Sequence, residues 1–213
     1  MKQRWIILVV FVLLVGLAAS PLAQAQEENT WNLNDLVQVV ANDLNRMWAT
    51  EFSELHVQYR PPTAISGYVQ RTRTACGRVR TQTALYCTAS HSIHYELGFM
   101  NSALRGIGDF AVAAVIAHEW GHAIQAQLGL LSPSSSLENE LQADCLAGAY
   151  ARYANDVSQI LEPGDYEEGR RLFSLIGDPE GLDADDELAH GTAAQRVASY
   201  ETGFREGVDG CFD

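Results

Sequence analysis

The 213-residue chain predicts an α+β fold that is mainly helical and contains one small sheet. Three observations support this class. Apolar residues recur at helical spacing near the start of the chain and again in its C-terminal half. The run FAVAAVIA at 110–117 carries no charge on any face. Residues 63–100 are rich in β-branched and aromatic residues separated by turn-like gaps. Strands and helices grouped in this way are typical of α+β proteins.

The N-terminal segment has the pattern of an export signal. Lys2 and Arg4 precede an apolar run, Trp5–Ala19, which is shorter than the roughly 20 residues of a comfortable membrane span. Small residues then lead to a cleavage site after Ala25. Residues 1–25 are therefore interpreted as a signal peptide, with an uncleaved anchor as the alternative.

The exported remainder, residues 26–213, is long enough for one domain with its own core. Its charge excludes some partners: the chain carries a formal charge of −13, and loss of Lys2 and Arg4 takes it to −15. Such an acidic protein is a poor partner for nucleic acid or an anionic membrane. We expect a secreted or cell-envelope protein that touches the membrane only through an uncleaved N-terminal anchor.

The four cysteines predict two disulfides, because an even number in an exported chain favours pairing. Three pairings are possible. The economical one joins Cys76 to Cys87 across a probable hairpin, which leaves Cys145 to join Cys211. A cysteine metal site is the weaker alternative, since no C-x-x-C spacing occurs.

The N-terminal half of the domain contains one helix and the sheet. Residues 33–55 form the helix, because Leu36, Val40 and Leu44 repeat at helical spacing. Two prolines at 61–62 then break the chain, and residues 63–100 supply two or three strands. His91 and His94 are interpreted as exposed polar positions on a strand.

The C-terminal half predicts four helices, whose ends are set by capping residues. Asp109 begins a helix over 110–128, which stops at Gly129. The other three are predicted over 137–155 with a Ser135/Glu138 capping box, over 165–176 before Gly177, and from a Thr192/Gln195 capping box to about Glu206.

The helix at 110–128 carries ionisable side chains at its centre, in the sequence HEWGH. Burying such groups is costly unless they are paired or bound to a metal. His118 and His122 are four residues apart and point from one helix face, so both imidazoles can bind one Zn²⁺. Glu119 is one position further round and can reach a water on that metal, as the general base of an H-E-x-x-H metalloprotease does. Gly121 removes a side chain, which permits another segment to approach closely.

The next helix, SLENELQADCLAGAY, supplies two carboxylates at the edge of its inner face. Glu140 and Asp144 are four residues apart there, whereas Glu138 points nearly opposite to Glu140. Glu140 is predicted as the third zinc ligand. Asp144 is predicted to accept a hydrogen bond from a ligand histidine and so fix its orientation. The alternative is a pair of solvated acids.

Four stretches resemble the bacterial family called "putative neutral zinc metallopeptidase". They are the helix that contains HEWGH, the helix that contains ELQADC, the segment TACGRVRTQTALYC and the tail HGTAAQRVASYETGFREG. The resemblance covers most of residues 68–211. It implies a zincin-like helical core with the downstream E-x-x-x-D pattern at Glu140 and Asp144. The chain departs from the family near Ser90, where an acidic residue is usual, and at Ala123, where a further histidine is frequent.

The expected activity is zinc-dependent hydrolysis of peptide bonds in a peptide or protein substrate, with Glu119 acting as base and then as acid. The transition state also needs a hydrogen-bond donor for its negative charge. His190 is the candidate, with Tyr95 and Tyr68 as weaker ones; a structural role for His190 before the last helix stays open. The alternatives to a peptidase are a non-catalytic zinc-binding envelope protein and a hydrolase of a non-peptide bond.

Overall fold

The structure is a computed structural model that describes residues 32–79, 83–131, 136–179, 181 and 189–212. The expected signal peptide and Ser135 lie outside these residues. The fold is α+β and mainly helical, as predicted. Its helices are α1 (Leu33–Glu54), α2 (Leu97–Gly106), α3 (Asp109–Leu128), α4 (Ser136–Tyr153), η1 (Ala154–Ser158), α5 (Asp165–Leu175), α6 (Ala193–Glu206) and η2 (Asp209–Cys211). Its strands are β1 (Ile65–Tyr68), β2 (Thr72–Thr74), β3 (Gly77–Val79), β4 (Ala84–Cys87) and β5 (Ser92–Glu96).

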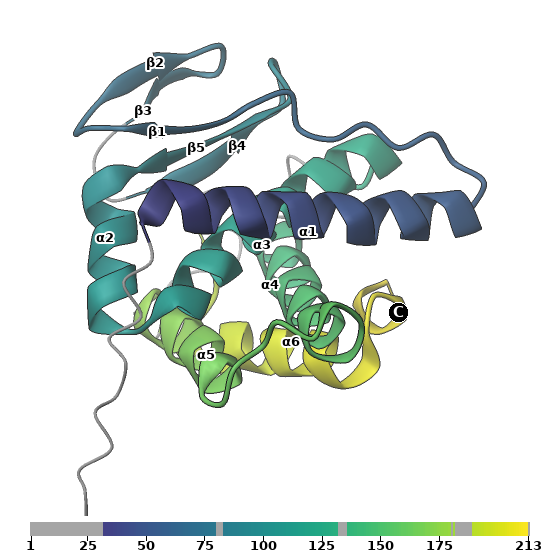
Figure 1. Cartoon of the computed structure of the whole chain (residues 1–213). Helices are drawn as coiled ribbons and strands as arrows, with labels where there is room; N and C mark the ends of the chain where they lie inside the picture. The colour runs from purple at the N-terminus through teal and green to yellow at the C-terminus, as the bar shows by residue number, and fades with distance from the viewer. Residues whose placement is uncertain (1–31, 80–82, 132–135, 180, 182–188, 213) are drawn as a thin grey trace, which may run out of the picture.

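Helix α3 is the centre of the molecule. Figure 1 shows the strands on one side of the molecule and α5 and α6 on the other, with α3 and α4 between them. Helix α3 contacts α1, α2, α4, α5 and the strands β4 and β5. These contacts explain why the run FAVAAVIA at 110–117 is apolar on every face, because a helix that is covered on all sides exposes no face to water.

The small sheet has three strands, as predicted, and a two-stranded hairpin stands beside it. Strand β5 is central in the order β1-β5-β4, parallel to β1 and antiparallel to β4. Strands β2 and β3 form a separate antiparallel hairpin. Strand β4 is an edge, and it is in contact with α3. One edge strand of the sheet, β4, therefore lies beside the helix that carries HEWGH.

Helix α2 was not predicted, and the expected sheet extended too far at residues 97–100. The chain passes from β5 into α2 without a turn, because the last strand residue, Glu96, caps the helix. Its carboxylate accepts the backbone N–H of Phe99 at 2.7 Å. Gly98 and Asn101 are weak helix formers, so local preference did not reveal the helix.

The predicted N-cap of α3 was also wrong. Asp109 is the first helical residue, and the cap position is Gly108, with φ of 154° and no side-chain hydrogen bond. A carboxylate from another helix takes over, because Glu168 accepts the Phe110 N–H at 3.0 Å. At the other end the prediction was right: Gly129 ends α3 in the left-handed conformation, with φ of 71°.

Helices α4 and α6 pack backbone against backbone. A Cβ on Gly203 would lie 1.8 Å from the carbonyl oxygen of Cys145, so only glycine permits this approach. The predicted capping box of Thr192 and Gln195 begins α6. The close packing carries the first turns of α6 to the buried face of α4, where Arg196 lies 3% exposed.

Two disulfides join Cys76 to Cys87 and Cys145 to Cys211, which is the predicted pairing. The second ties the C-terminal turn to α4. Disulfides persist in oxidising compartments, so both indicate an environment outside the cytoplasm. None of the helices in the described ranges combines the length and apolar composition of a membrane crossing.

Candidate metal centre

Helix α3 presents two imidazoles from one face. The rings of His118 and His122 have their centroids 4.7 Å apart. Both residues are mostly buried, with side chains 10% and 14% exposed. The i, i+4 spacing in the sequence placed them together, as predicted.

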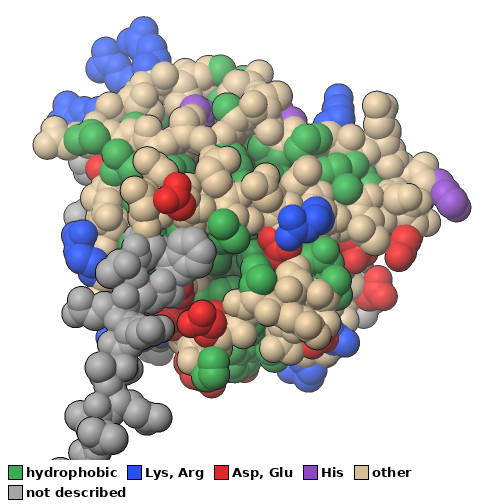
Figure 2. Space-filling view, in the orientation of Figure 1, with side chains coloured by type: hydrophobic (Ala, Val, Ile, Leu, Met, Phe, Trp, Pro, Cys, Tyr) green, Lys and Arg blue, Asp and Glu red, His purple; other side chains and the backbone are tan. Residues whose placement is uncertain are grey.

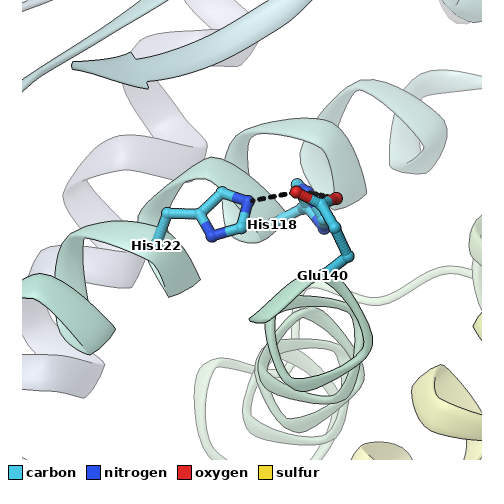
Figure 3. A group of neighbouring side chains, drawn as sticks. All are labelled: His118, His122 and Glu140. Carbon is cyan, nitrogen blue, oxygen red and sulfur yellow. Dashed lines mark ion pairs between the residues drawn. The ribbon is translucent and has the colours of Figure 1, made fainter. Parts of the chain in front are cut away.

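Helix α4 brings Glu140 to the same point (Figure 3). Its Oε2 lies 3.2 Å from Nε2 of His118, and its Oε1 lies 3.3 Å from Nε2 of His122. The three ligand atoms fall within 4.8 Å of one another. Two ligands at about 2.0–2.1 Å from a tetrahedral zinc are themselves about 3.3–3.4 Å apart. The separation of each imidazole nitrogen from its nearer carboxylate oxygen, 3.2 and 3.3 Å, is close to this value.

The close packing of α3 on α4 depends on Gly121. A Cβ there would lie 3.1 Å from the Cα of Ala143, one turn from the carboxylate ligand. The closely approaching segment anticipated from the sequence is therefore α4. The helix phase also agrees with the prediction, because Glu138 is exposed while Glu140 faces the histidines.

The Nδ1 atom of His118 lies 2.8 Å from Oδ1 of Asp144, the contact predicted for this carboxylate. Asp144 is fully buried, and a second partner balances its charge. Arg196 of α6 donates to both carboxylate oxygens at 2.8 Å, through Nε and Nη2. The guanidinium also lies over the ring of Phe173, 5.5 Å from its centroid. Nothing in the sequence pattern around Arg196 indicated this role.

The Nδ1 atom of His122 lies 2.8 Å from the amide oxygen of Gln125, which is also buried. The orientation of that amide is fixed, because its nitrogen donates to the carbonyl of Asn139 at 2.8 Å and to Oε1 of Gln142 at 2.9 Å. The oxygen therefore faces His122 and needs a donor, so Nδ1 carries the proton. Nε2 keeps its lone pair for a metal.

Electrostatics also favour a cation at this point. Burial opposes a charge on His118, but its hydrogen bonds to Asp144 and Glu140 outweigh that effect and raise the pKa of the imidazole to about 10. Burial alone would raise the pKa of Glu140, yet the two histidines hold it well below its usual range. Asp144 and Glu140 thus favour a positive charge at His118. A divalent metal bound between the three side chains would provide that positive charge in place of the proton.

Comparison with known proteins agrees with this donor set. The family model described as "Putative neutral zinc metallopeptidase" matches residues 15–212. The chain belongs to this family.

The relatives themselves have no stated activity. "Uncharacterized protein YpfJ" of Escherichia coli K12 is 29% identical over 95% of this chain and 83% of its own length. "Uncharacterized protein Rv2575" of Mycobacterium tuberculosis is 29% identical, over 63% of this chain and 56% of its own length. No solved structure matches the chain.

Glu119 lies beside the candidate ligands in a cavity of about 470 Å³. Its carboxylate accepts the backbone N–H of Tyr86 on strand β4. Burial raises the pKa of Glu119, although the charges of both histidines oppose the shift. A buried carboxylate of raised basicity next to the metal ligands is suited to taking a proton.

The candidate oxyanion donors differ in position. His190 lines the same cavity, with its side chain half exposed and its Nδ1 3.7 Å from Oδ1 of Asp178. Tyr68 and Tyr95 are buried and do not line the cavity, although the Tyr68 hydroxyl donates to the carbonyl of Thr83, which does. Arg196 does line it, with Nη2 4.0 Å from Oε2 of Glu140.

Proposed function

We propose that the protein is a zinc-dependent peptidase that hydrolyses peptide bonds outside the cytoplasm. One observation carries this proposal: the three candidate ligands face a cavity that also contains Glu119, a carboxylate outside the ligand set. A catalytic zinc site keeps one position open, whereas a structural site closes it with a fourth protein ligand.

Zinc, when bound, polarises the scissile carbonyl and lowers the pKa of water. The chain supplies the proton transfers. Glu119 takes a proton from the attacking water and delivers it to the leaving amine. His190 donates a hydrogen bond to the developing oxyanion. Asp144 and Gln125 hold the two imidazoles in orientation, and Arg196 holds Asp144 in place through two hydrogen bonds.

The substrate backbone pairs with the edge of strand β4. The Glu96 N–H donates to the carbonyl of Thr83, so the backbone polar groups of Thr83 point into the sheet. Those of its neighbour Ala84 point away from the sheet, towards the open edge. The N–H of Tyr86 also points outward, to Glu119. Thr83, Ala84, Leu85 and Tyr86 all line the cavity of the metal ligands. An extended peptide added to this edge would pass beside the candidate metal ligands.

The rival function is a non-catalytic zinc-binding protein of the envelope. A structural zinc usually has cysteine or histidine at its fourth position. All four cysteines are in disulfides, and no further histidine belongs to the candidate ligand group among the described residues. The rival also leaves the buried Glu119 without a purpose.

The test is digestion of a peptide library by the purified, zinc-loaded protein, with products identified by mass spectrometry. We expect cleavage that a chelator abolishes and that zinc restores. Glu119→Gln should abolish cleavage while zinc content stays near one per chain, and Glu138→Gln, at an exposed position, should leave both unchanged. Zinc binding without cleavage of any peptide would favour the rival, and loss of zinc from Glu119→Gln would make this residue a ligand or a structural group.

A further inference from the structure

A second cavity, of about 630 Å³, lies beyond Tyr86 from the candidate metal centre. Tyr86 lines both cavities. Along α3 the lining residues follow in order, from His118 and His122 in the first cavity to Gln127 in the second. The two cavities therefore succeed each other along the same helix. The polar side chains of the second belong to Arg60, Thr63, Tyr86, Thr88, His91 and Gln127.

Hydrogen bonds fix the walls of the second cavity. His91, which the sequence predicted to be exposed, is half-buried, with Nδ1 2.8 Å from the hydroxyl of Tyr86 and Nε2 2.9 Å from the carbonyl oxygen of Arg60. The Arg60 N–H donates to Oε1 of Gln127 at 2.9 Å. The segment between α1 and β1, which passes near the end of α3 in Figure 1, is thus held at this point on both sides.

The guanidinium of Arg60 is available to a ligand. Its side chain is exposed, and it forms no ion pair within the described part of the chain. No carboxylate is among the described residues that line this cavity, although the whole protein carries a charge of −13. The charge of Arg60 acts on Tyr86, the side chain between the two cavities. Burial raises the pKa of Tyr86, and Arg60 opposes this shift in part.

We propose that this second cavity is a substrate subsite in which Arg60 binds the carboxylate of an acidic side chain. The inference rests on the proposed peptidase function. A peptide on the β4 edge advances about 3.3 Å per residue. Thr88 lies two residues after Tyr86, so the subsite lies about two substrate positions beyond the residue opposite Tyr86. The protein therefore selects substrates with aspartate or glutamate at one fixed distance from the scissile bond.

The test compares residue frequencies around the cleavage sites of a peptide library. The wild-type protein should favour aspartate or glutamate at one position by about two- to fivefold, the range of a solvated ion pair. Arg60→Gln should remove this preference, so that acidic peptides are cleaved no faster than neutral ones, while zinc content stays the same. Arg60→Glu should reverse it in favour of lysine and arginine. In 1 M salt the wild-type preference should weaken, because the Debye length falls to about 3 Å.

The matched control is Arg73→Gln on β2. Figure 2 shows Arg side chains gathered at the corner that the β2–β3 hairpin occupies in Figure 1. Arg73 is exposed there and lines neither cavity; its loss should leave the preference intact. Chelator-sensitive cleavage with no acidic preference, or with a preference that survives Arg60→Gln, would overturn the subsite and leave the peptidase standing. Absence of any cleavage by the zinc-loaded protein would contradict both proposals.

Discussion

The side-chain amide of Gln142 donates a hydrogen bond of 2.9 Å to the backbone carbonyl of Cys211. The other end of the same side chain accepts from Gln125, whose oxygen faces His122. A continuous path of hydrogen bonds thus runs from a candidate zinc ligand to the C-terminal turn. The Cys145–Cys211 disulfide holds that turn against α4.

Loss of this path should weaken zinc binding without touching a ligand. Gln125→Leu removes the partner of His122 and should raise the zinc dissociation constant by about 10- to 100-fold. Gln142→Leu frees the Gln125 amide to rotate and should have a smaller effect in the same direction. Competition with a chelator measures both constants, and Gln38→Leu, at an exposed position on α1, is the control. Unchanged constants in two well-folded variants would show that the path has no effect on the metal.

The third ligand is tested by a pair of neighbouring carboxylates. Glu140→Ala should strip zinc and abolish the proposed activity, because no second carboxylate of the described residues belongs to this ligand group. Glu138→Ala should keep the metal, since that side chain is exposed. If it caps the start of α4, the loss should cost about 1 kcal/mol of unfolding free energy. Elemental analysis of both purified variants decides the matter, and the reverse outcome would mean that the assigned phase of α4 is wrong.

The sequence was sufficient for those parts of the site that helical periodicity controls. His118, His122 and Glu140 were placed by spacing within single helices, and the disulfides by economy of pairing. Gln125 was accessible by the same logic, because it lies three residues after His122 on one helix and such residues are neighbours. It was missed because a glutamine beside a zinc ligand is inconspicuous, whereas a second histidine or carboxylate is not.

The parts that depend on tertiary packing could not be predicted in this way. Arg196 lies 52 residues from Asp144 and has the appearance of an ordinary surface charge on an amphipathic helix. Only the glycine contact between α4 and α6 buries it. The N-terminal contact of α3 was missed for the same reason, because it comes from a distant helix, at Glu168. Helix α2 was missed for a local reason, since its cap, Glu96, lies in the preceding strand and its first residues include weak helix formers.

Arg196 should matter to stability through the charge that it balances. In Arg196→Gln the buried carboxylate of Asp144 loses its guanidinium partner, which should lower the unfolding free energy by about 3–5 kcal/mol. Adding Asp144→Asn removes that charge, so the double variant should be less destabilised than the two single losses sum to. Arg205→Gln, on the same helix with its side chain 63% exposed, should cost at most about 1 kcal/mol. Urea unfolding of the metal-free wild type, both single variants and the double variant measures these free energies. Strict additivity of the two single losses would contradict an interaction between Arg196 and Asp144.

The acidic cluster at the start of α3 predicts a dependence of stability on pH. Asp109, Asp165 and Glu168 have carboxylate oxygens within 4.8 Å of one another. Burial raises the pKa of Asp165 to about 6 and that of Glu168 to about 7, with repulsion from Asp109 adding to both shifts. Between their unfolded pKa values near 4 and these folded values, the folded state binds more protons than the unfolded state. The contribution of these groups is therefore most favourable below about pH 4 and is lost as the pH rises to about 7.

The double variant Asp165→Asn with Glu168→Gln removes this loss and keeps both hydrogen-bond acceptors, for the N–H groups of Glu162 and Phe110. Its unfolding free energy relative to wild type should increase steadily from pH 4 to pH 7 and then level off. Urea unfolding of both metal-free proteins across this range measures the difference, so that effects of the zinc ligands cancel. A difference that stays constant with pH would show that neither carboxyl titrates in this window, and one that falls would reverse the sign of the shifts.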